Sequence, residues 1–334
     1  MVCDLPPYRP PRGLRGGHRQ SILPTLFRTV EGVTYRRERL ELADGDFLDL
    51  DWAGPKADRV AVVAHGLEGS SDRAYVRGMA RALARRGWAV CAWNMRGCSG
   101  EPNRLLRAYH SGASDDFDAV VQHVLGRDPE AVAVVGFSLG GNVTLKWLGE
   151  QGEAVDPRLV GGVGVSVPVD LGASSETMEA WSRRIYMLRF LRKLSAKAEE
   201  KARRFPEAPD PAGVHAMRTF REFDGHFTAP VHGFESAEDY WTRASSKPLL
   251  PESRVPTLLL NALDDPFLAP SCFPYAEADA NPYLTLVTPR WGGHVGFIAA
   301  GGEFYSEAVA GKFLDAAYAA SVASPSRSAP SSTA

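Results

Sequence analysis

A serine at position 138 lies at the centre of residues 136–140 (GFSLG), which have the form G-x-S-x-G. The motif directly follows an apolar, strand-like run at 131–135 (AVAVV) and directly precedes a helical stretch at 142–148. A strand–turn–helix with this motif holds a serine in a strained turn, where bulky side chains two residues away would clash. The alternative is a glycine-rich turn with a surface serine. The context favours Ser138 as a nucleophile at a helix N-terminus.

A serine hydroxyl needs a base to take its proton, and His294 is the candidate. Residues 283–287 (YLTLV) read as the last strand, and residues 290–297 (RWGGHVGF) follow it. His294 alone among the eight histidines occupies that loop. We expect the two preceding glycines to leave space for the imidazole to reach Ser138. A lone histidine is usually structural, but the chain order serine, acid, histidine supports the catalytic interpretation.

The third partner is an aspartate in the turn after the strand at 255–260 (VPTLLL). Asp264 and Asp265 both lie there, and we favour Asp265 because it immediately precedes Pro266, which should fix the turn. The other aspartate is then an exposed turn residue or a helix cap. In the predicted triad, His294 removes the Ser138 proton and returns it to the leaving group, while Asp265 orients the imidazole and stabilises its charged form.

A glycine-rich stretch at 65–69 (HGLEG) follows the apolar run at 59–64 (RVAVVA). A backbone N–H from such a turn, together with the one after the nucleophile, can hold the oxyanion of a tetrahedral intermediate. The candidates are the amides of Leu67 and Leu139. An ordinary tight turn is the alternative, made less plausible by the G-x-S-x-G motif further along the chain.

These residues require a sheet to position them. The alternating runs at 36–42 and 47–52 predict an antiparallel hairpin. Apolar strands then alternate with helices at 75–86, 114–125 and 142–148, which predicts a mostly parallel sheet covered by helices on both faces. The pattern stops at 170–250 and resumes at 255. We therefore expect an irregular arm at 1–30, a core at 31–169 and 251–320, a helical cap insertion at 170–250 and a disordered tail at 321–334.

Composition excludes several other classes of protein. A formal net charge of −2 gives no field that would attract nucleic acid. Four cysteines without C-x-x-C spacing argue against a zinc site or a disulfide framework, and no histidine–carboxylate cluster has metal-ligand spacing. We expect no cofactor and no metal. No run approaches the roughly 20 apolar residues of a membrane span, and residues 1–17 lack the apolar core of a secretory signal, so we expect a cytoplasmic protein.

Longer motifs add a family resemblance. Residues 65–83 (HGLEGSSDRAYVRGMARAL), 94–117, GFSLGGN, GGHVGF, 219–241 and the arm at 13–28 together resemble the YheT-like branch of the α/β-hydrolases. This resemblance covers roughly residues 10–315. It implies the α/β-hydrolase fold and a serine hydrolase with a helical cap that cleaves carboxylic esters, often of lipid type, in the manner of abhydrolase-domain esterases and lipases. Some relatives transfer the acyl group to an alcohol, which is the alternative to hydrolysis. A non-catalytic binding protein would show a broken triad, which is not found here.

Two features bear on the substrate. Arg96 lies after a strand, near the predicted site, where it either contacts an anionic substrate group or, as we favour, anchors loops by hydrogen bonds. The stretch 181–205 carries an apolar stripe among Arg and Lys residues. It packs within the cap, lines an acyl pocket or touches a membrane surface. The first two interpretations are favoured, and we expect a small ester substrate with an apolar acyl part.

Overall fold

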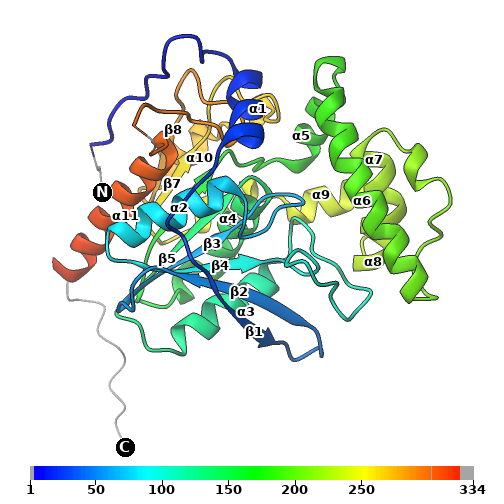
Figure 1. Ribbon diagram of the computed structural model, residues 1–334, viewed down its shortest axis with the longest axis horizontal. Coiled ribbons are helices and arrows are strands. Elements are labelled where there is room, and N and C mark those ends of the chain that lie inside the picture. The colour runs from blue at the N-terminus through cyan, green and yellow to red at the C-terminus, as the bar shows by residue number, and fades with distance from the viewer. Residues whose placement is uncertain (1–3, 302, 324–334) are drawn as a thin grey trace, which may run out of the picture.

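The computed structural model describes residues 4–301 and 303–323. The predicted α/β-hydrolase architecture is confirmed, with strands and helices alternating along the chain (Figure 1). The strands are β1 (Arg36–Glu41), β2 (Phe47–Ala53), β3 (Arg59–Ala64), β4 (Ala89–Asn94), β5 (Ala131–Phe137), β6 (Leu159–Val165), β7 (Thr257–Leu260) and β8 (Leu284–Val287). The helices are α1 (Gly17–Phe27), α2 (Ala74–Arg85), α3 (Ser114–Leu125), α4 (Leu139–Gln151), α5 (Leu171–Met178), α6 (Arg184–Arg204), α7 (Phe220–Phe223), α8 (Ala229–His232), α9 (Ala237–Ala244), α10 (Tyr275–Ala280) and α11 (Tyr305–Ala323).

The strands form one sheet in the order β1-β2-β4-β3-β5-β6-β7-β8. The hairpin β1–β2 is antiparallel, as its alternating sequence predicts, and β2 pairs antiparallel with β4. The remaining pairs are parallel. The carboxyl ends of β5, β7 and β8 therefore lie along the same edge of the sheet, and the three predicted catalytic residues follow those ends.

Burial on both faces explains why the central strands read as unbroken apolar runs. In β3, Val60 and Val62 face one core cluster while Ala61 and Val63 face the other. The first cluster includes side chains of α3 and α4, and the second includes side chains of α2 and α11. The period of two along each strand thus sends successive residues to opposite layers of helices.

The cap, as we call residues 170–250, lies between β6 and β7 and contains α5 to α9. Figure 1 shows α6, α7 and α8 gathered at the end of the molecule away from α11. The basic stretch predicted to be helical begins as a 3₁₀ turn at Trp181–Arg183 and continues as α6. One buried face of α6 and the short helices around it form a separate apolar cluster.

Two sequence expectations about the ends of the chain need correction. The arm at 1–30 is not irregular throughout, because it contains α1. The sequence does not indicate this helix, because Pro24 lies inside it and because its buried side chains, Gln20 and Ser21, are polar and form no apolar stripe. At the other end, α11 continues to Ala323, so the first three residues of the expected tail are helical. The rest of that tail, 324–334, lies outside the described residues.

Candidate active site

The turn between β5 and α4 holds Ser138 in a conformation that few side chains tolerate. Its φ is 53° and its ψ is −121°, and α4 begins at the next residue. A Cβ atom at Gly136 would lie 2.4 Å from the carbonyl oxygen of Gly140, and one at Gly140 would lie 2.2 Å from the carbonyl oxygen of His65. Both glycines of the motif are therefore required by close backbone contacts. This arrangement leaves Ser138 half-exposed among buried neighbours.

The structure brings Ser138, His294 and Asp265 together. The Ser138 hydroxyl lies 2.9 Å from His294 Nε2. On the other side of the ring, Nδ1 lies 2.9 Å from Oδ2 and 3.1 Å from Oδ1 of Asp265. Because an ionised carboxylate only accepts hydrogen bonds, Nδ1 carries the proton and Nε2 is free to accept the serine proton. The geometry is that of a nucleophile, a base and an orienting acid.

Asp264 has a different role from its neighbour. Its Oδ1 accepts a hydrogen bond of 2.8 Å from the amide of Gly293, while Oδ2 is buried and has no hydrogen-bond partner among the described residues. Burial, and then the nearby charge of Asp265, raise the pKa of the Asp264 carboxyl. Asp264 thus supports the backbone of the histidine loop, and only Asp265 contacts the imidazole.

Residues that the sequence analysis missed hold the imidazole in place. The Phe267 ring stacks on the His294 ring, with centroids 4.0 Å apart and planes inclined by 25°. The amide of His294 donates to Ser21 Oγ, and the amide of Val295 donates to Ser166 Oγ. Ser166, which follows β6, has a φ of 54°, and Val295 in the histidine loop has one of 58°, so the backbone is strained on both sides of this hydrogen bond. No local motif signals these contacts.

The arm contributes further contacts through Gln20, which is fully buried. Its Oε1 accepts hydrogen bonds from the amide of Ile298 and from the hydroxyl of Tyr8. A Cβ atom at Gly293 would lie 2.4 Å from the carbonyl oxygen of Gly17. The glycine before His294 therefore makes room for α1, not for the swing of the imidazole that the sequence analysis expected.

The turn at 65–69 contains a backbone amide that has no hydrogen-bond acceptor among the described residues. Within it, the amide of Gly66 donates to Tyr75 Oη, that of Glu68 to Tyr109 Oη, and that of Gly69 to the carbonyl oxygen of Gly66. Among the described residues, the amide of Leu67 has no such acceptor. Leu139 is the first residue of α4, where an amide has no acceptor within its own helix. Both candidate oxyanion donors are thus unused by the fold.

His65 and Arg96 serve the fold. His65 Nε2 accepts from the amide of Met95, so its Nδ1 donates to the carbonyl oxygen of Gly66. Burial lowers the pKa of His65 to about 4, and the ring is neutral. Arg96 donates to both oxygens of Asp116 and to Asp46, and all three side chains are almost fully buried. Arg96 therefore anchors loops, as we favoured, and is occupied by protein carboxylates.

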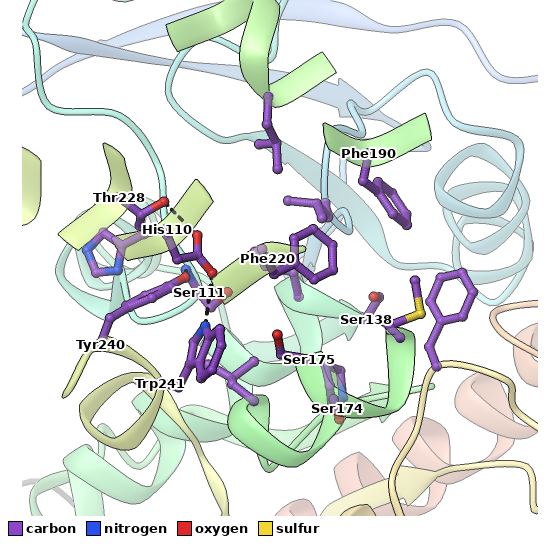
Figure 2. A pocket seen from close by; sticks show the side chains of 18 of the residues that line it. His110, Ser111, Ser138, Ser174, Ser175, Phe190, Phe220, Thr228, Tyr240 and Trp241 are labelled. Carbon is purple, nitrogen blue, oxygen red and sulfur yellow. Dashed lines mark hydrogen bonds between the residues drawn. The ribbon is translucent and has the colours of Figure 1, made fainter. Parts of the chain in front are cut away.

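A pocket of about 140 Å³ extends from Ser138 beneath the cap. Figure 2 shows Phe220 between the serine and the far end, where Thr228, Tyr240 and Trp241 gather, and Phe190 on the same side as the serine. His110, which sequence reasoning treated as structural, also lines this pocket. Burial, followed by the neighbouring His232, lowers the pKa of His110 to about 3. The pocket is mostly apolar, but its far end is not.

A second, wider groove reaches Ser138 from the other side, between α1 and α6. Its walls include the apolar Ile22 and Leu26 and the cationic Arg73, Arg189 and Lys193. Several apolar side chains of α1, α6 and the 3₁₀ turn before α6 are exposed, namely Phe27, Ile185, Leu188 and Trp181. The two faces of α6 therefore differ: one packs inside the cap, and the other borders an open groove.

Comparisons with known proteins agree with this fold. A family model described as the alpha/beta hydrolase fold matches residues 62–299. "Putative esterase YheT" of Escherichia coli (strain K12) is 40% identical over 302 residues, which cover 87% of this chain and 87% of the relative. The human protein "Phospholipase ABHD3" is 30% identical over 295 residues, covering 84% of this chain and 71% of its own. Among solved structures, esterase Pf2001 of Pyrococcus furiosus superposes with a TM-score of 0.58 at 16% identity, covering 95% and 99% of the two chains, a likeness that concerns the fold.

Proposed function

This chain belongs to the α/β-hydrolase fold family and is a carboxylic ester hydrolase, and from that premise we propose that it acts through Ser138, His294 and Asp265. The resemblance to the YheT-like branch is confirmed by the 40% identity to the Escherichia coli relative. The observation that carries the proposal is the unbroken hydrogen-bonded chain from the serine hydroxyl through both imidazole nitrogens to the carboxylate.

The proposed reaction has two halves. Ser138 Oγ attacks the ester carbonyl while His294 Nε2 takes its proton, and the amides of Leu67 and Leu139 stabilise the oxyanion. His294 then returns the proton to the departing alcohol, which leaves an acyl group on Ser138. Water attacks that acyl-enzyme while His294 Nε2 takes its proton, and His294 then passes the proton to Ser138 Oγ as the bond to the acyl group breaks and the acid departs. Asp265 stabilises the imidazolium in both halves.

The two cavities suggest how an ester would lie. The pocket beneath the cap would take the acyl chain, because Phe190, Phe220 and Met178 form its walls. The groove between α1 and α6 would take the alcohol part, and an alcohol bound there could also intercept the acyl-enzyme. Acyl transfer is therefore the second candidate. Product analysis with ester and added alcohol separates the two: a new ester as the main product would favour transfer, and free acid would favour hydrolysis.

The exposed apolar side chains of α6 and of the turn before it support a transient contact with a lipid surface. Trp181 and Ile185 are 87% and 72% exposed, and the groove between α6 and α1 contains cationic residues. Among the described residues, no helix is long and apolar enough to cross a membrane. An Ile185→Asp variant should lower binding to anionic phosphatidylglycerol vesicles in a flotation assay. Leu263→Asp, at another exposed site, is the matched control, and equal loss in both would contradict this orientation.

Removing the hydroxyl oxygen of Ser138 tests the catalytic proposal. Ser138→Ala should abolish cleavage of p-nitrophenyl esters and labelling by a fluorophosphonate probe, because both reactions need the same alkoxide. Ser70→Ala, which removes a serine hydroxyl outside both cavities, should keep both activities. Retained labelling in Ser138→Ala would contradict the assignment of the nucleophile.

A further inference from the structure

The far end of the pocket contains a carboxylate with no cationic partner. Asp224 lines the pocket, where its two oxygens accept hydrogen bonds from the Thr228 hydroxyl (2.7 Å) and the Trp241 indole (2.9 Å). Among the ion pairs of the described residues, none involves this side chain. A carboxylate has about four acceptor positions, so the two protein donors leave capacity for a ligand. Charges withdrawn from water are normally paired, and this partly buried carboxylate has no such pair.

An unusual turn of helix places this carboxylate. Residues Asp224–Thr228 form a π-helical turn between α7 and α8, a rare geometry that is frequent at functional sites. The turn brings the Thr228 hydroxyl onto Asp224, and α9 supplies the indole of Trp241. Burial raises the pKa of the Asp224 carboxyl to about 6, so the group is mostly ionised at neutral pH. Figure 2 shows its two partners, Thr228 and Trp241, at the end of the pocket away from Ser138.

A second polar group in the same pocket lacks a partner. Ser175, on α5, is only 5% exposed, and its hydroxyl has no hydrogen-bond partner among the described residues. Figure 2 shows it between Ser138 and Trp241, along the path that an acyl chain would follow. Leaving a buried hydroxyl unpaired is costly, and a chain of methylene groups would not relieve that cost. Two independent side chains of one pocket therefore have hydrogen-bonding capacity that the described residues do not use.

We propose that the pocket selects an acyl chain that carries a hydroxyl group toward its far end, and that Asp224 accepts the hydrogen bond of this hydroxyl while Ser175 offers a further polar contact. The inference rests on the proposed function, because it assigns the pocket to the acyl part of the ester. It adds a polar end to the apolar acyl part expected from the sequence. A site built around a polar group discriminates strongly against an analogue that lacks it, since its own polar atoms are then left unsatisfied.

Paired substrates test this inference. The full-length enzyme is assayed with p-nitrophenyl ω-hydroxyalkanoates of graded length, each compared with the methyl-terminated ester of the same number of heavy atoms. At one chain length, kcat/KM for the hydroxylated ester should exceed that of its partner by about 10-fold or more, the typical worth of a hydrogen bond to a charged group. A preference for the methyl-terminated ester at every length would overturn the proposal.

Variants assign the preference to its residues. Asp224→Asn and Ser175→Ala should each lower the ratio of the two kcat/KM values. The serine change removes an unpaired hydroxyl and thus costs no hydrogen bond of the free protein, so it tests the proposal even where the aspartate change harms folding. Ser253→Ala, which deletes another buried and unpartnered hydroxyl outside the pocket, should leave the ratio unchanged.

The remaining outcomes are also decisive. An unchanged ratio in both pocket variants would overturn the assignment to Asp224 and Ser175. A preference for ω-amino esters over ω-hydroxy esters would overturn the choice of a hydroxyl and point to a cationic ligand. Ser138→Ala, assayed with the same esters, distinguishes failure of the proposed catalytic triad from failure of the proposed hydroxyl selectivity. Hydrolysis that survives in Ser138→Ala would refute the triad. Hydrolysis that requires Ser138 but is equally fast with hydroxylated and methyl-terminated esters would refute only this inference.

Discussion

Replacing Asp265 by asparagine should disable His294 while leaving the fold intact. The asparagine oxygen can take the place of Oδ1, which accepts the amide proton of Phe267 at 2.9 Å. Its NH₂ group then occupies the place of Oδ2, 2.9 Å from His294 Nδ1. Two donors cannot face each other there, so the imidazole proton moves to Nε2. In that tautomer the ring cannot accept the proton of Ser138.

The alternative orientation of the asparagine is also costly. Its oxygen would then face His294, and its NH₂ would face the Phe267 amide, leaving donors unpaired at a cost of about 1–3 kcal/mol, or roughly 5- to 150-fold in the competent population. The neutral side chain also stabilises the imidazolium less than a carboxylate does. Together these effects should lower kcat by about 10³- to 10⁴-fold, the range expected when a triad histidine loses its correct tautomer.

The assay is the steady-state hydrolysis of a p-nitrophenyl ester, with circular dichroism to check folding. Asp264→Asn is the matched control. It keeps an acceptor for the Gly293 amide and replaces the unpaired Oδ2, so kcat should change only a few-fold. Because burial raises the pKa of Asp264, ionisation destabilises the native state as pH rises through that pKa. The free energy of unfolding of Asp264→Asn, compared with that of the unchanged protein, should therefore be more favourable at neutral pH than at acid pH. A larger loss of kcat in Asp264→Asn than in Asp265→Asn would refute the reasoning.

Three further predictions concern the elements that hold the site. Gly136→Ala should lower the free energy of unfolding by about 1–3 kcal/mol and abolish activity, because the new Cβ would lie 2.4 Å from the carbonyl oxygen of Gly140. Chemical denaturation checks this against Gly225→Ala, where the nearest atom to the new Cβ is the side-chain Cβ of Ala237, 4.0 Å away. Arg96→Leu should destabilise the protein by about 3–5 kcal/mol, since it leaves buried carboxylates unpaired, and an unchanged melting temperature would contradict the anchoring role. The pKa of His110 is lowered from 6.5 to about 3. Below pH 6.5 the unfolded chain therefore binds a proton at this histidine that the native state does not bind. The free energy of unfolding then falls by up to about 1.4 kcal/mol for each pH unit of acidification. His110→Gln should therefore show a shallower loss of melting temperature on acidification, and parallel curves would count against the neutral, buried ring.

The residues that bring the site together could be predicted because their signals are local. A buried strand followed at once by G-x-S-x-G specifies the turn at Ser138, and the steric reason for its glycines holds in the structure. His294 and Asp265 follow from chain order and from their positions after strands. Parallel strands that are buried on both faces consist of continuous apolar runs, which can be recognised in the sequence without knowing which strands pair with one another.

Contacts between distant segments could not be predicted in this way. The helix α1 has no apolar stripe, because its buried residues are Gln20 and Ser21, and its helical form depends on packing against the histidine loop. The stacking of Phe267 on His294 depends on the shape of a turn that the sequence only suggests. Asp224 was not identified from the sequence because the short helical turns around it are too brief to show a periodic pattern that would indicate which side chains point inward.

The hydrogen bonds that the amides of His294 and Ile298 donate to Ser21 and Gln20 join residues 273 and 278 positions apart. Such remote partners meet only after most of the chain has collapsed, whereas the turn at Ser138 is built from neighbours. During refolding, the nucleophile should thus be shaped before its base is aligned, and esterolysis should return later than the helical signal. A half-folded molecule would accordingly hold Ser138 in its turn without the base that activates it.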